Sequence, residues 1–292
     1  MAGNNKPALW VHEIHRGMVS LGFRVEKTLF SGQSPFQKVD VVKTAGHGNM
    51  LLNDGIIMLS EKDEFVYHEM IAHVPLFVHP DPHRVLIIGG GDGGTAREVL
   101  KHKNVTSVVM VEIDKMVVDA CRAHMPSVSG ALDDPRLELV FDDGVEYAKR
   151  AKRTFDVAII DSTDPIGPAA PLFDGTFYNN IARLLSPDGI MITQSESPFY
   201  DREIQLSMFS NQRPHFSRLH MYLFPTLTYP GGLWSFGFAS KSRCPISDFN
   251  KNRAADAYME MKYYNTQVHR AAFALPEFVR KPLSHLLDPL PE

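Results

Sequence analysis

Residues 85–100 read VLIIGGGDGGTAREVL, and this stretch decides the fold of the chain. Four apolar residues predict a buried strand, which runs into a turn with five glycines in six residues and then into a helix. A strand, a glycine turn and a helix N-terminus let backbone N–H groups approach a ligand closely. Asp92 lies inside the turn, where its carboxylate would repel a pyrophosphate. The turn therefore favours a nucleoside that carries positive charge over a dinucleotide.

A second strand and a terminal acid follow at the spacing that such a unit predicts. Residues 106–111 are mostly apolar, and Glu112 comes directly after them, 19 positions beyond Gly93. An acidic residue about 20 positions beyond the glycine turn can accept hydrogen bonds from ribose hydroxyls. Glycine-rich turns alone are common, but the whole series of strand, turn, helix, strand and Glu112 favours a nucleoside site over a simple tight turn.

The composition is that of a globular enzyme. Of the 292 residues, 44% are hydrophobic and 22% charged, and a net charge of −4 offers no basic field for nucleic acid or anionic lipid. Cys121 and Cys244 form neither a disulfide framework nor a metal quartet, and we expect Cys121 to be a core residue of a helix. Because we find no signal-peptide core and no apolar run of membrane length, we expect a cytoplasmic protein.

The first part of the chain predicts a small antiparallel β-domain. Alternating apolar and polar residues predict strands at 22–30 and 36–43, and residues 46–49 and 53–55 indicate hairpin turns between short strands. Residues 64–76 predict a helix that packs on a neighbouring element. Since a His-Pro-Asp-Pro sequence breaks the pattern at 79–82, we place the β-domain and its linking helix at 1–78 and a catalytic domain at 79–292.

Strands and helices alternate along the second part. Strands are expected at 85–88, 107–111, 137–140, 157–160, 189–194, 218–223 and 234–240, and helices between them at 115–123, 144–151 and 176–185. This order predicts an α/β fold with a doubly wound, mostly parallel, Rossmann-like sheet and helices on both faces.

Acidic residues directly follow four of the predicted strands. They are Asp92, Glu112, the pair Asp142 and Asp143, and Asp161. Since an open parallel sheet binds ligands at the carboxyl ends of its strands, we expect these acids to surround one site. The Asp142-Asp143-Gly144 sequence could accept from an exocyclic adenine amine, or an Asp there could only cap the next helix.

Asp161 is the sharpest candidate, because it ends a strongly apolar strand. The loop after that strand reads DSTDPIGP and holds a second carboxylate, Asp164, with no lysine or arginine as far as Phe173. An ordinary Asp–Pro turn is the alternative. Two carboxylates without a local cation, and without Cys or His ligands for a metal, favour a polycationic substrate.

Several further side chains have either a packing role or a binding role. They are Tyr67, His68, Trp10, Tyr229 and Trp234. Aromatic walls suit an aliphatic chain with ammonium ends, although each of these residues could simply belong to the core. No HExxH, GxSxG or Walker sequence occurs, which argues against a zinc protease, a serine hydrolase and a P-loop NTPase.

A set of short motifs runs through nearly the whole chain. They are DG at 54–55, SEKDEFVYHEM at 60–70, GGGDGG at 89–94, VEID at 111–114, DDG at 142–144, DSTDPIGP at 161–168, YPGG at 229–232, YYN at 263–265 and HRAAFALP at 269–276. This specific set resembles the polyamine aminopropyltransferase family, to which spermidine synthases belong. Met58 departs from the pattern, since several members carry glutamine there.

The resemblance implies a transferase that moves the aminopropyl group of decarboxylated S-adenosylmethionine to putrescine, giving spermidine and 5′-methylthioadenosine. By similarity, the donor would be held by Gln37, Asp92, Glu112, Asp143, Gly144 and Pro168. The amine would be held by Tyr67, His68, Asp92, Asp161, Asp164 and Tyr229, with Trp10, Gln194 and Trp234 along its channel. The resemblance also implies a homodimer or homotetramer, no metal or other cofactor, no nucleic-acid or membrane partner, and a loop after Asp161 that orders over substrate.

Asp161 is the expected proton acceptor of this reaction. A sulfonium donor leaves as a neutral thioether, so the harder step is to make a nucleophile from an alkylammonium, whose pKa is about 10.4. An aspartate with an ordinary pKa of about 3.9 is a poor base, so we expect desolvation to narrow this gap. We expect the proton to move in concert with the attack of the amine.

Two other functions remain open on the sequence. A methyltransferase that uses ordinary S-adenosylmethionine explains the glycine turn and Glu112, but not the paired acids at Asp161, and Asp92 would repel the extra carboxylate of that donor. A non-catalytic polyamine-binding or regulatory protein predicts loss of the proton acceptor, whereas Asp161 and Asp164 are both present. Among acceptors we expect putrescine first, cadaverine weakly and spermidine little.

Overall fold

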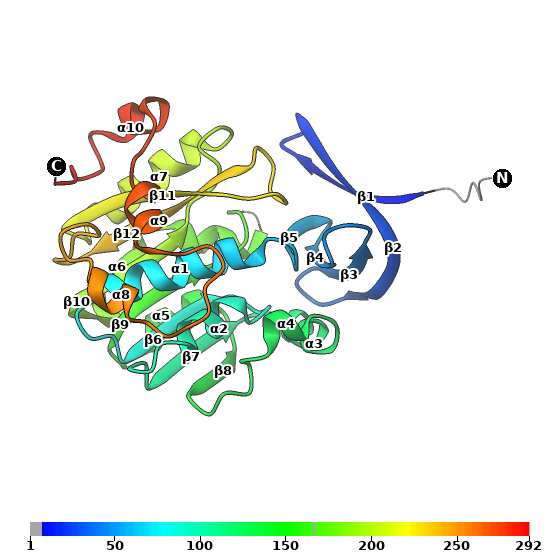
Figure 1. Cartoon of the computed structure of the whole chain (residues 1–292), viewed down its shortest axis with the longest axis horizontal. Coiled ribbons are helices and arrows are strands. Elements are labelled where there is room, and N and C mark those ends of the chain that lie inside the picture. The colour runs from blue at the N-terminus through cyan, green and yellow to red at the C-terminus, as the bar shows by residue number, and fades with distance from the viewer. Residues whose placement is uncertain (1–7, 166, 292) are drawn as a thin grey trace.

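The computed structural model describes residues 8–165 and 167–291 and contains two sheets (Figure 1). The smaller sheet has five strands in chain order, each antiparallel to the next. They are β1 (Leu9–His15), β2 (Val19–Gln33), β3 (Lys38–Thr44), β4 (Asn49–Asn53) and β5 (Ile56–Ser60). This arrangement confirms the small antiparallel β-sheet expected at the N-terminal end.

The small sheet is held by a two-residue hairpin turn and by apolar clusters on both faces. Asp54 and Gly55 adopt φ values of 50° and 82°, the left-handed conformation that the tight turn between β4 and β5 requires. Val41 and Leu51 on one face are buried with Cys121 of helix α3 (Lys115–His124), and Met50 and Leu52 are buried on the other. Cys121 is thus a core residue of a helix, as expected.

The larger sheet has seven strands in the order β11-β12-β10-β9-β6-β7-β8. They are β6 (Arg84–Gly89), β7 (Ser107–Glu112), β8 (Leu137–Phe141), β9 (Phe155–Asp161), β10 (Leu185–Gln194), β11 (Arg218–Pro225) and β12 (Leu233–Ser240). The five strands from β8 to β10 are parallel, and β12 is antiparallel to both of its neighbours. The predicted doubly wound, mostly parallel sheet is confirmed.

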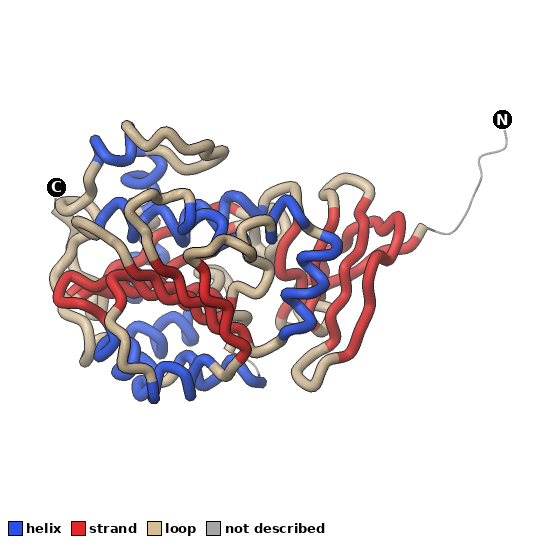
Figure 2. The backbone as a smooth tube through the Cα atoms, turned by 90° about the horizontal axis from the view of Figure 1, so that it is seen from below, coloured by secondary structure: helices blue, strands red, loops and turns tan. Residues whose placement is uncertain are grey.

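Helices cover both faces of this sheet, as Figure 2 shows. In order they are α1 (Glu64–Val78), α2 (Gly94–Leu100), α3, α4 (Pro126–Ser129), α5 (Gly144–Arg150), the 3₁₀ helix η1 (Gly167–Phe173), α6 (Gly175–Leu184), α7 (Arg202–Gln212), α8 (Lys251–Ala255), α9 (Thr266–Ala272) and α10 (Glu277–Leu283). Alternate residues of β6 enter the two cores: Val85 and Ile87 pack with α1, and Leu86 and Ile88 pack with α6. The four apolar residues of the opening stretch thus bury both faces of a central strand.

Helix α1 is buried on almost every side because it lies between the large sheet and the C-terminal segment. Its residues Met70 and Phe77 belong to the core of that sheet. On the other side, the Glu69 carboxylate accepts hydrogen bonds from three consecutive backbone N–H groups, those of residues 262–264. The small sheet ends at Ser60, whereas α1 packs with the large unit; the domain boundary after residue 78 stays a prediction.

The sequence patterns missed elements that carry no clear periodicity. Strand β1 and helices α7 to α10 were not predicted, and β10 begins at Leu185 rather than at residue 189. In the part of the chain that the structure describes, every helix is too short or too polar to cross a membrane.

Candidate active site

A cavity lies where the carboxyl ends of β6, β7 and β9 face the hairpin of β4 and β5. It brings together most of the candidate residues: Gln37, Tyr67, His68, Asp92, Glu112, Asp143, Gly144, Asp161, Asp164, Gln194, Tyr229 and Trp234. These residues come from both sheets, so the small sheet forms one wall of the site. Met58 also lines this wall.

Two candidates do not contribute described side chains to the cavity. Trp10 is 54% exposed on β1 and lies outside the lining that the described residues form. Side chains alternate along a strand, and on β1 it is Val11, Glu13 and His15 that turn inward. The side chain of Pro168 lies outside the described residues, although its backbone belongs to η1.

Glu13 is a cavity residue that the sequence analysis missed. Its carboxylate is buried and accepts a hydrogen bond from the Ile57 N–H group at 2.8 Å. Burial, reinforced by the charge of Asp164, raises the pKa of Glu13 to about 7 against that hydrogen bond. Only the inward face of β1 could have indicated this residue, and that strand was not predicted.

The glycine loop makes room for functional side chains. A Cβ atom on Gly91 would lie 2.8 Å from the Glu112 carboxylate, and one on Gly94 would lie 2.2 Å from the His68 ring. Gly90 has a φ of 70°, a left-handed backbone conformation that glycine adopts more easily than residues with a side chain. The sequence analysis attributed these glycines to close approach of a ligand; the structure adds that they let Glu112 and His68 reach the cavity.

Glu112 is fixed at the end of β7 by two backbone donors. Its Oε1 accepts from the Asp114 N–H group at 2.8 Å, and its Oε2 accepts from the Gly91 N–H group at 3.1 Å. Burial raises the pKa of Glu112 to about 7, against these hydrogen bonds. Because backbone groups cannot rotate away, the carboxylate presents its remaining lone pairs in one direction.

Gln37 and Asp143 complete this end of the cavity. Gln37 Nε2 donates to Asp114 Oδ2 at 3.1 Å, which links the β2–β3 turn to the start of α3. Asp143 caps α5, because its Oδ1 accepts from the Val145 N–H group at 2.7 Å, and it also lines the cavity. The neighbouring Asp142 instead pairs with Arg150. The capping interpretation of Asp143 is thus correct, and it does not remove the residue from the site.

At the other end of the cavity, Asp161 accepts from two hydroxyl groups. Tyr67 Oη donates to its Oδ1 at 2.7 Å, and Thr95 Oγ1 donates to its Oδ2 at 2.6 Å. Burial and the neighbouring Asp92 carboxylate raise the pKa of Asp161, against the His68 cation and the two hydroxyl donors. Thr95 was missed because a threonine in the first turn of a helix carries no sequence signal of its own.

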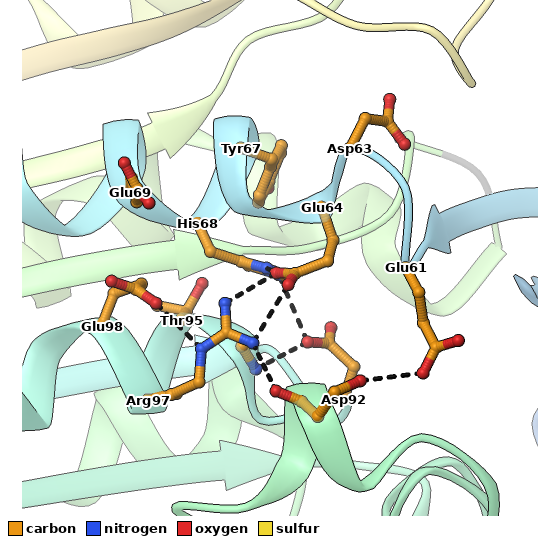
Figure 3. Close-up of polar contacts among 12 residues, drawn as sticks. Glu61, Asp63, Glu64, Tyr67, His68, Glu69, Asp92, Thr95, Arg97 and Glu98 are labelled. Carbon is orange, nitrogen blue, oxygen red and sulfur yellow. Dashed lines mark hydrogen bonds and ion pairs between the residues drawn. The ribbon is translucent and has the colours of Figure 1, made fainter. Parts of the chain in front are cut away.

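His68 lies between two carboxylates (Figure 3). Its Nδ1 is 2.6 Å from Glu64 Oε2, and its Nε2 is 3.3 Å from Asp92 Oδ1. Burial alone would lower the pKa of His68, but Asp92 and Glu64 outweigh it and raise that pKa to about 10. The two carboxylates therefore favour the imidazolium form, in which Nδ1 donates to Glu64 and Nε2 forms an ion pair with Asp92. Among the described residues, polar atoms of His68, Asp92 and Asp161 lie within 4.8 Å of one another.

An aromatic wall closes the site beside Tyr67. The Tyr229 ring lies 6.2 Å from the Tyr67 ring and 4.9 Å from the Trp234 ring, and the Tyr229 hydroxyl donates to the Met58 carbonyl oxygen. The loop that carries Tyr229 is anchored by Asp63, which accepts from the Leu227 N–H group and the Thr228 hydroxyl. The N-terminal end of α1 thus positions this wall as well as His68.

Comparison with known proteins identifies the family. The profile of the "Spermine/spermidine synthase domain" matches residues 64–251, and that of the "Spermidine synthase tetramerisation domain" matches residues 9–61. Polyamine aminopropyltransferases are 45% identical in Alkaliphilus metalliredigens, over 95% of this chain and 98% of that protein, and 46% identical in Thermotoga petrophila, over 94% of each.

Solved structures agree with this result. A spermidine synthase in complex with the transition-state analogue AdoDATO superposes with a TM-score of 0.94 at 44% identity, over 96% of each chain. The spermidine synthase of Thermotoga maritima gives a TM-score of 0.91 at 43% identity, over 97% of this chain and 96% of that one. The chain therefore belongs to the spermine/spermidine synthase family and is a polyamine aminopropyltransferase.

Proposed function

We propose that the protein transfers the aminopropyl group of decarboxylated S-adenosylmethionine to putrescine, with Asp161 as the proton acceptor. One observation carries this proposal: the partly buried Asp161 carboxylate, whose pKa is raised, lies beside Asp92 in the cavity that Glu112 and the aromatic wall also line. The similar spermidine synthase solved in complex with the transition-state analogue AdoDATO supports this class of activity.

We propose that the two ends of the cavity hold the two substrates. Glu112 would accept from the ribose hydroxyls, while the rest of the nucleoside end is formed by Gln37, Asp143, Gly144 and Pro168. Asp92, Asp161 and Asp164 would face the ammonium groups, with Tyr67, His68, Tyr229, Gln194 and Trp234 around the acceptor. Because Trp10 faces outward on β1, we do not retain it as a channel residue of its own subunit.

The step that we propose is a nucleophilic substitution. The amine nitrogen of the acceptor attacks the aminopropyl carbon bonded to the sulfonium, and the electron pair of the C–S bond goes to sulfur. The nitrogen passes one proton to a carboxylate oxygen of Asp161. Burial and Asp92 raise the pKa of Asp161, the direction that narrows the gap to the ammonium. The sulfur leaves as a neutral thioether, so this proposal assigns no role to a metal or other cofactor.

A mass-spectrometric assay tests the proposal. Purified protein is incubated with either decarboxylated or ordinary S-adenosylmethionine, and with putrescine, cadaverine, agmatine or spermidine as acceptor. We expect an aminopropylated product and 5′-methylthioadenosine from the decarboxylated donor, with the largest kcat/KM for putrescine. Methyl transfer from the ordinary donor, or binding of amines without any transfer, would contradict the proposal. A larger kcat/KM for spermidine or agmatine than for putrescine would show that the proposed acceptor is wrong but would leave the proposed reaction class unchanged.

We also propose that the protein forms a homodimer or homotetramer through its small sheet. The match of residues 9–61 to a tetramerisation domain supports this, and so do four large apolar side chains that are more than half exposed on the first hairpin: Leu9, Trp10, Ile14 and Met18. Light scattering of the parent and of Ile14→Glu tests the proposal. We expect the variant to have a smaller mass; a monomeric parent would contradict it.

A further inference from the structure

Arg97 lies behind the amine end of the cavity and binds Glu64 with two nitrogens. Its Nη1 donates to Glu64 Oε1 at 3.1 Å, and its Nη2 donates to Glu64 Oε2 at 2.8 Å (Figure 3). Glu64 Oε2 in turn faces His68 Nδ1, one helical turn away on α1. A two-point contact fixes the plane of a carboxylate as well as its position. The contacts therefore form a series from Arg97 through Glu64 and His68 to Asp92.

Arg97 is itself held by groups outside the cavity. Its Nε donates to Glu98 at 2.8 Å, and its Nη1 also donates to the Ser127 carbonyl oxygen at 2.8 Å. Glu98 is buried and pairs further with Lys101 and His73. These contacts order the guanidinium without any ligand, so Glu64 has a fixed partner before substrate arrives.

The His68 ring has little freedom once Glu64 is fixed. The residue is 2% exposed, and its ring lies against Gly94 so closely that a Cβ there would be 2.2 Å away. With Nδ1 directed at Glu64, Nε2 is left to face Asp92. Asp92 Oδ1 also accepts from the Gly94 N–H group at 2.7 Å. The Gly94 N–H group and His68 Nε2 therefore both face Oδ1 of Asp92, the first in a hydrogen bond and the second in an ion pair.

We propose that Glu64 and Arg97 are positioning residues of the amine end: they hold the His68 imidazole so that it donates from both nitrogens and keeps Asp92 Oδ1 occupied. The second oxygen of Asp92 is then left for a substrate ammonium. This inference rests on the amine-binding roles proposed above for His68 and Asp92. It adds that the charge and the orientation of His68 are set by two residues outside the proposed set of amine-binding side chains.

The charged groups around His68 determine what loss of the Glu64 charge would do. Glu64 on α1, Asp92 in the glycine loop and Asp161 on β9 favour the imidazolium, and Arg97 on α2 opposes it. Without the Glu64 carboxylate, the guanidinium would face the ring cation unbalanced. We then expect the pKa of His68 to fall by about one to three pH units. Asp92 would lose a fixed donor and bind an ammonium less well.

The test combines nitrogen NMR of the histidine rings with steady-state kinetics. Glu64→Gln keeps an oxygen acceptor for Nδ1 but removes the charge, and Arg97→Lys keeps the charge but loses the two-point contact. His68 is assigned from the signals that disappear in His68→Gln. In the parent at about pH 8 we expect both ring nitrogens of His68 to be protonated. In Glu64→Gln we expect the ring to lose its proton at a pH about one to three units lower than in the parent, and KM for the diamine to rise by about tenfold or more.

Lys101→Gln is the matched control, because it removes a partner of Glu98 at the far side of the same polar network. It should leave both the His68 signals and the diamine KM unchanged. Unchanged His68 signals and KM in Glu64→Gln would overturn the inference, and if that variant fails to fold, the same result in Arg97→Lys would do so. His68→Gln and Asp92→Asn test the underlying proposal separately: if they keep full diamine affinity, the proposed amine end is wrong whatever the NMR result.

Discussion

The two ends of the cavity hold their central carboxylates in different ways. Glu112 accepts from two backbone N–H groups, whereas Asp161 accepts from the hydroxyls of Tyr67 and Thr95. A backbone donor keeps both its proton and its direction. A hydroxyl can rotate and can turn from donor to acceptor when the carboxylate gains a proton. The hydrogen bonds to Glu112 therefore keep one arrangement. The hydroxyl groups around Asp161 can reorient if its carboxylate gains a proton.

This contrast explains why similar burial serves two different purposes. Burial raises the pKa of both carboxyl groups, that of Glu112 to about 7. If Glu112 accepts from the ribose as proposed, this shift is a cost of placing a buried acceptor there. For Asp161 as the proposed proton acceptor, the same direction of shift makes the group a better base. Mutations at the two ends should therefore affect different kinetic constants.

The largest effect is expected from Asp161→Asn. The amide keeps the shape of the side chain but cannot take the proton, so we expect kcat to fall by about 10²-fold or more. Asp156→Asn, at the other end of the same strand, is the control and should keep kcat within about twofold. Stopped-assay kinetics on both variants decide the point, and a kcat for Asp161→Asn within a few-fold of the parent would remove its role as proton acceptor.

Thr95→Val sharpens the contrast by removing one hydroxyl from Asp161. Since the hydrogen bond favours the ionised carboxylate, its loss should raise the pKa of Asp161 further, so that less of the carboxylate is ionised at low pH and kcat there falls by about tenfold. The acid limb of the kcat–pH profile should move to higher pH. Thr193→Val, a buried threonine of β10 outside the described lining of the cavity, controls for the loss of a hydroxyl. A profile that superposes on that of the parent would show that the hydroxyl has no influence on the proton acceptor.

Glu112→Gln should weaken binding of the decarboxylated donor and have little effect on diamine binding or on kcat. A neutral acceptor replaces a charged one at the ribose hydroxyls, which we expect to cost about 1–3 kcal/mol of donor affinity. Calorimetric titration with the decarboxylated donor measures this directly. Unchanged donor affinity together with impaired diamine binding would mean that the nucleoside does not bind at Glu112.

A smaller loss of donor affinity should follow when the pH is lowered. Because burial raises the pKa of Glu112 to about 7, the proposed ribose acceptor is ionised above that pH and becomes protonated below it. Donor affinity should therefore fall between about pH 8 and about pH 6 in the parent and stay flat in Glu112→Gln. Calorimetry at several pH values tests this, and an equal slope in both proteins would assign the titration to another group.

Removal of divalent metal should leave the catalytic activity of the protein unchanged. Polar atoms of His68, Asp92 and Asp161 lie within 4.8 Å of one another, but a metal would have to displace a proton that two carboxylates stabilise on the His68 ring. We expect kcat/KM to be unchanged after dialysis against a chelator. A loss that Mg²⁺ or Zn²⁺ restores would contradict this description of His68.

The sequence predicted the fold and the donor end more completely than the amine end. Residues 85–100 and Glu112 follow one another along the chain at a fixed spacing, so pattern alone could place them. The surroundings of Asp161 and His68 depend on side chains that meet across α1, α2 and β9, which no local pattern reports. Thr95 and Arg97 illustrate this, since both lie in a short helix whose function appears only in three dimensions.

The wall formed by the small sheet was the least predictable part of the site. Strand β1 pairs through backbone groups and shows no strong alternation of apolar residues, so the inward position of Glu13 and the outward position of Trp10 could not be derived from the sequence. The resemblance placed Trp10 in the channel, whereas the alternation of side chains on β1 turns it away from the described cavity.

A single-turnover experiment at saturating donor tests most directly whether the two ends divide binding from proton transfer. Enzyme preloaded with decarboxylated S-adenosylmethionine is mixed with excess putrescine, and spermidine formation is followed by rapid quench. We predict that Glu112→Gln reaches nearly the rate of the parent once donor saturates it, whereas Asp161→Asn stays slower by about 10²-fold at any donor concentration. Equal losses in both variants under saturation would contradict the division.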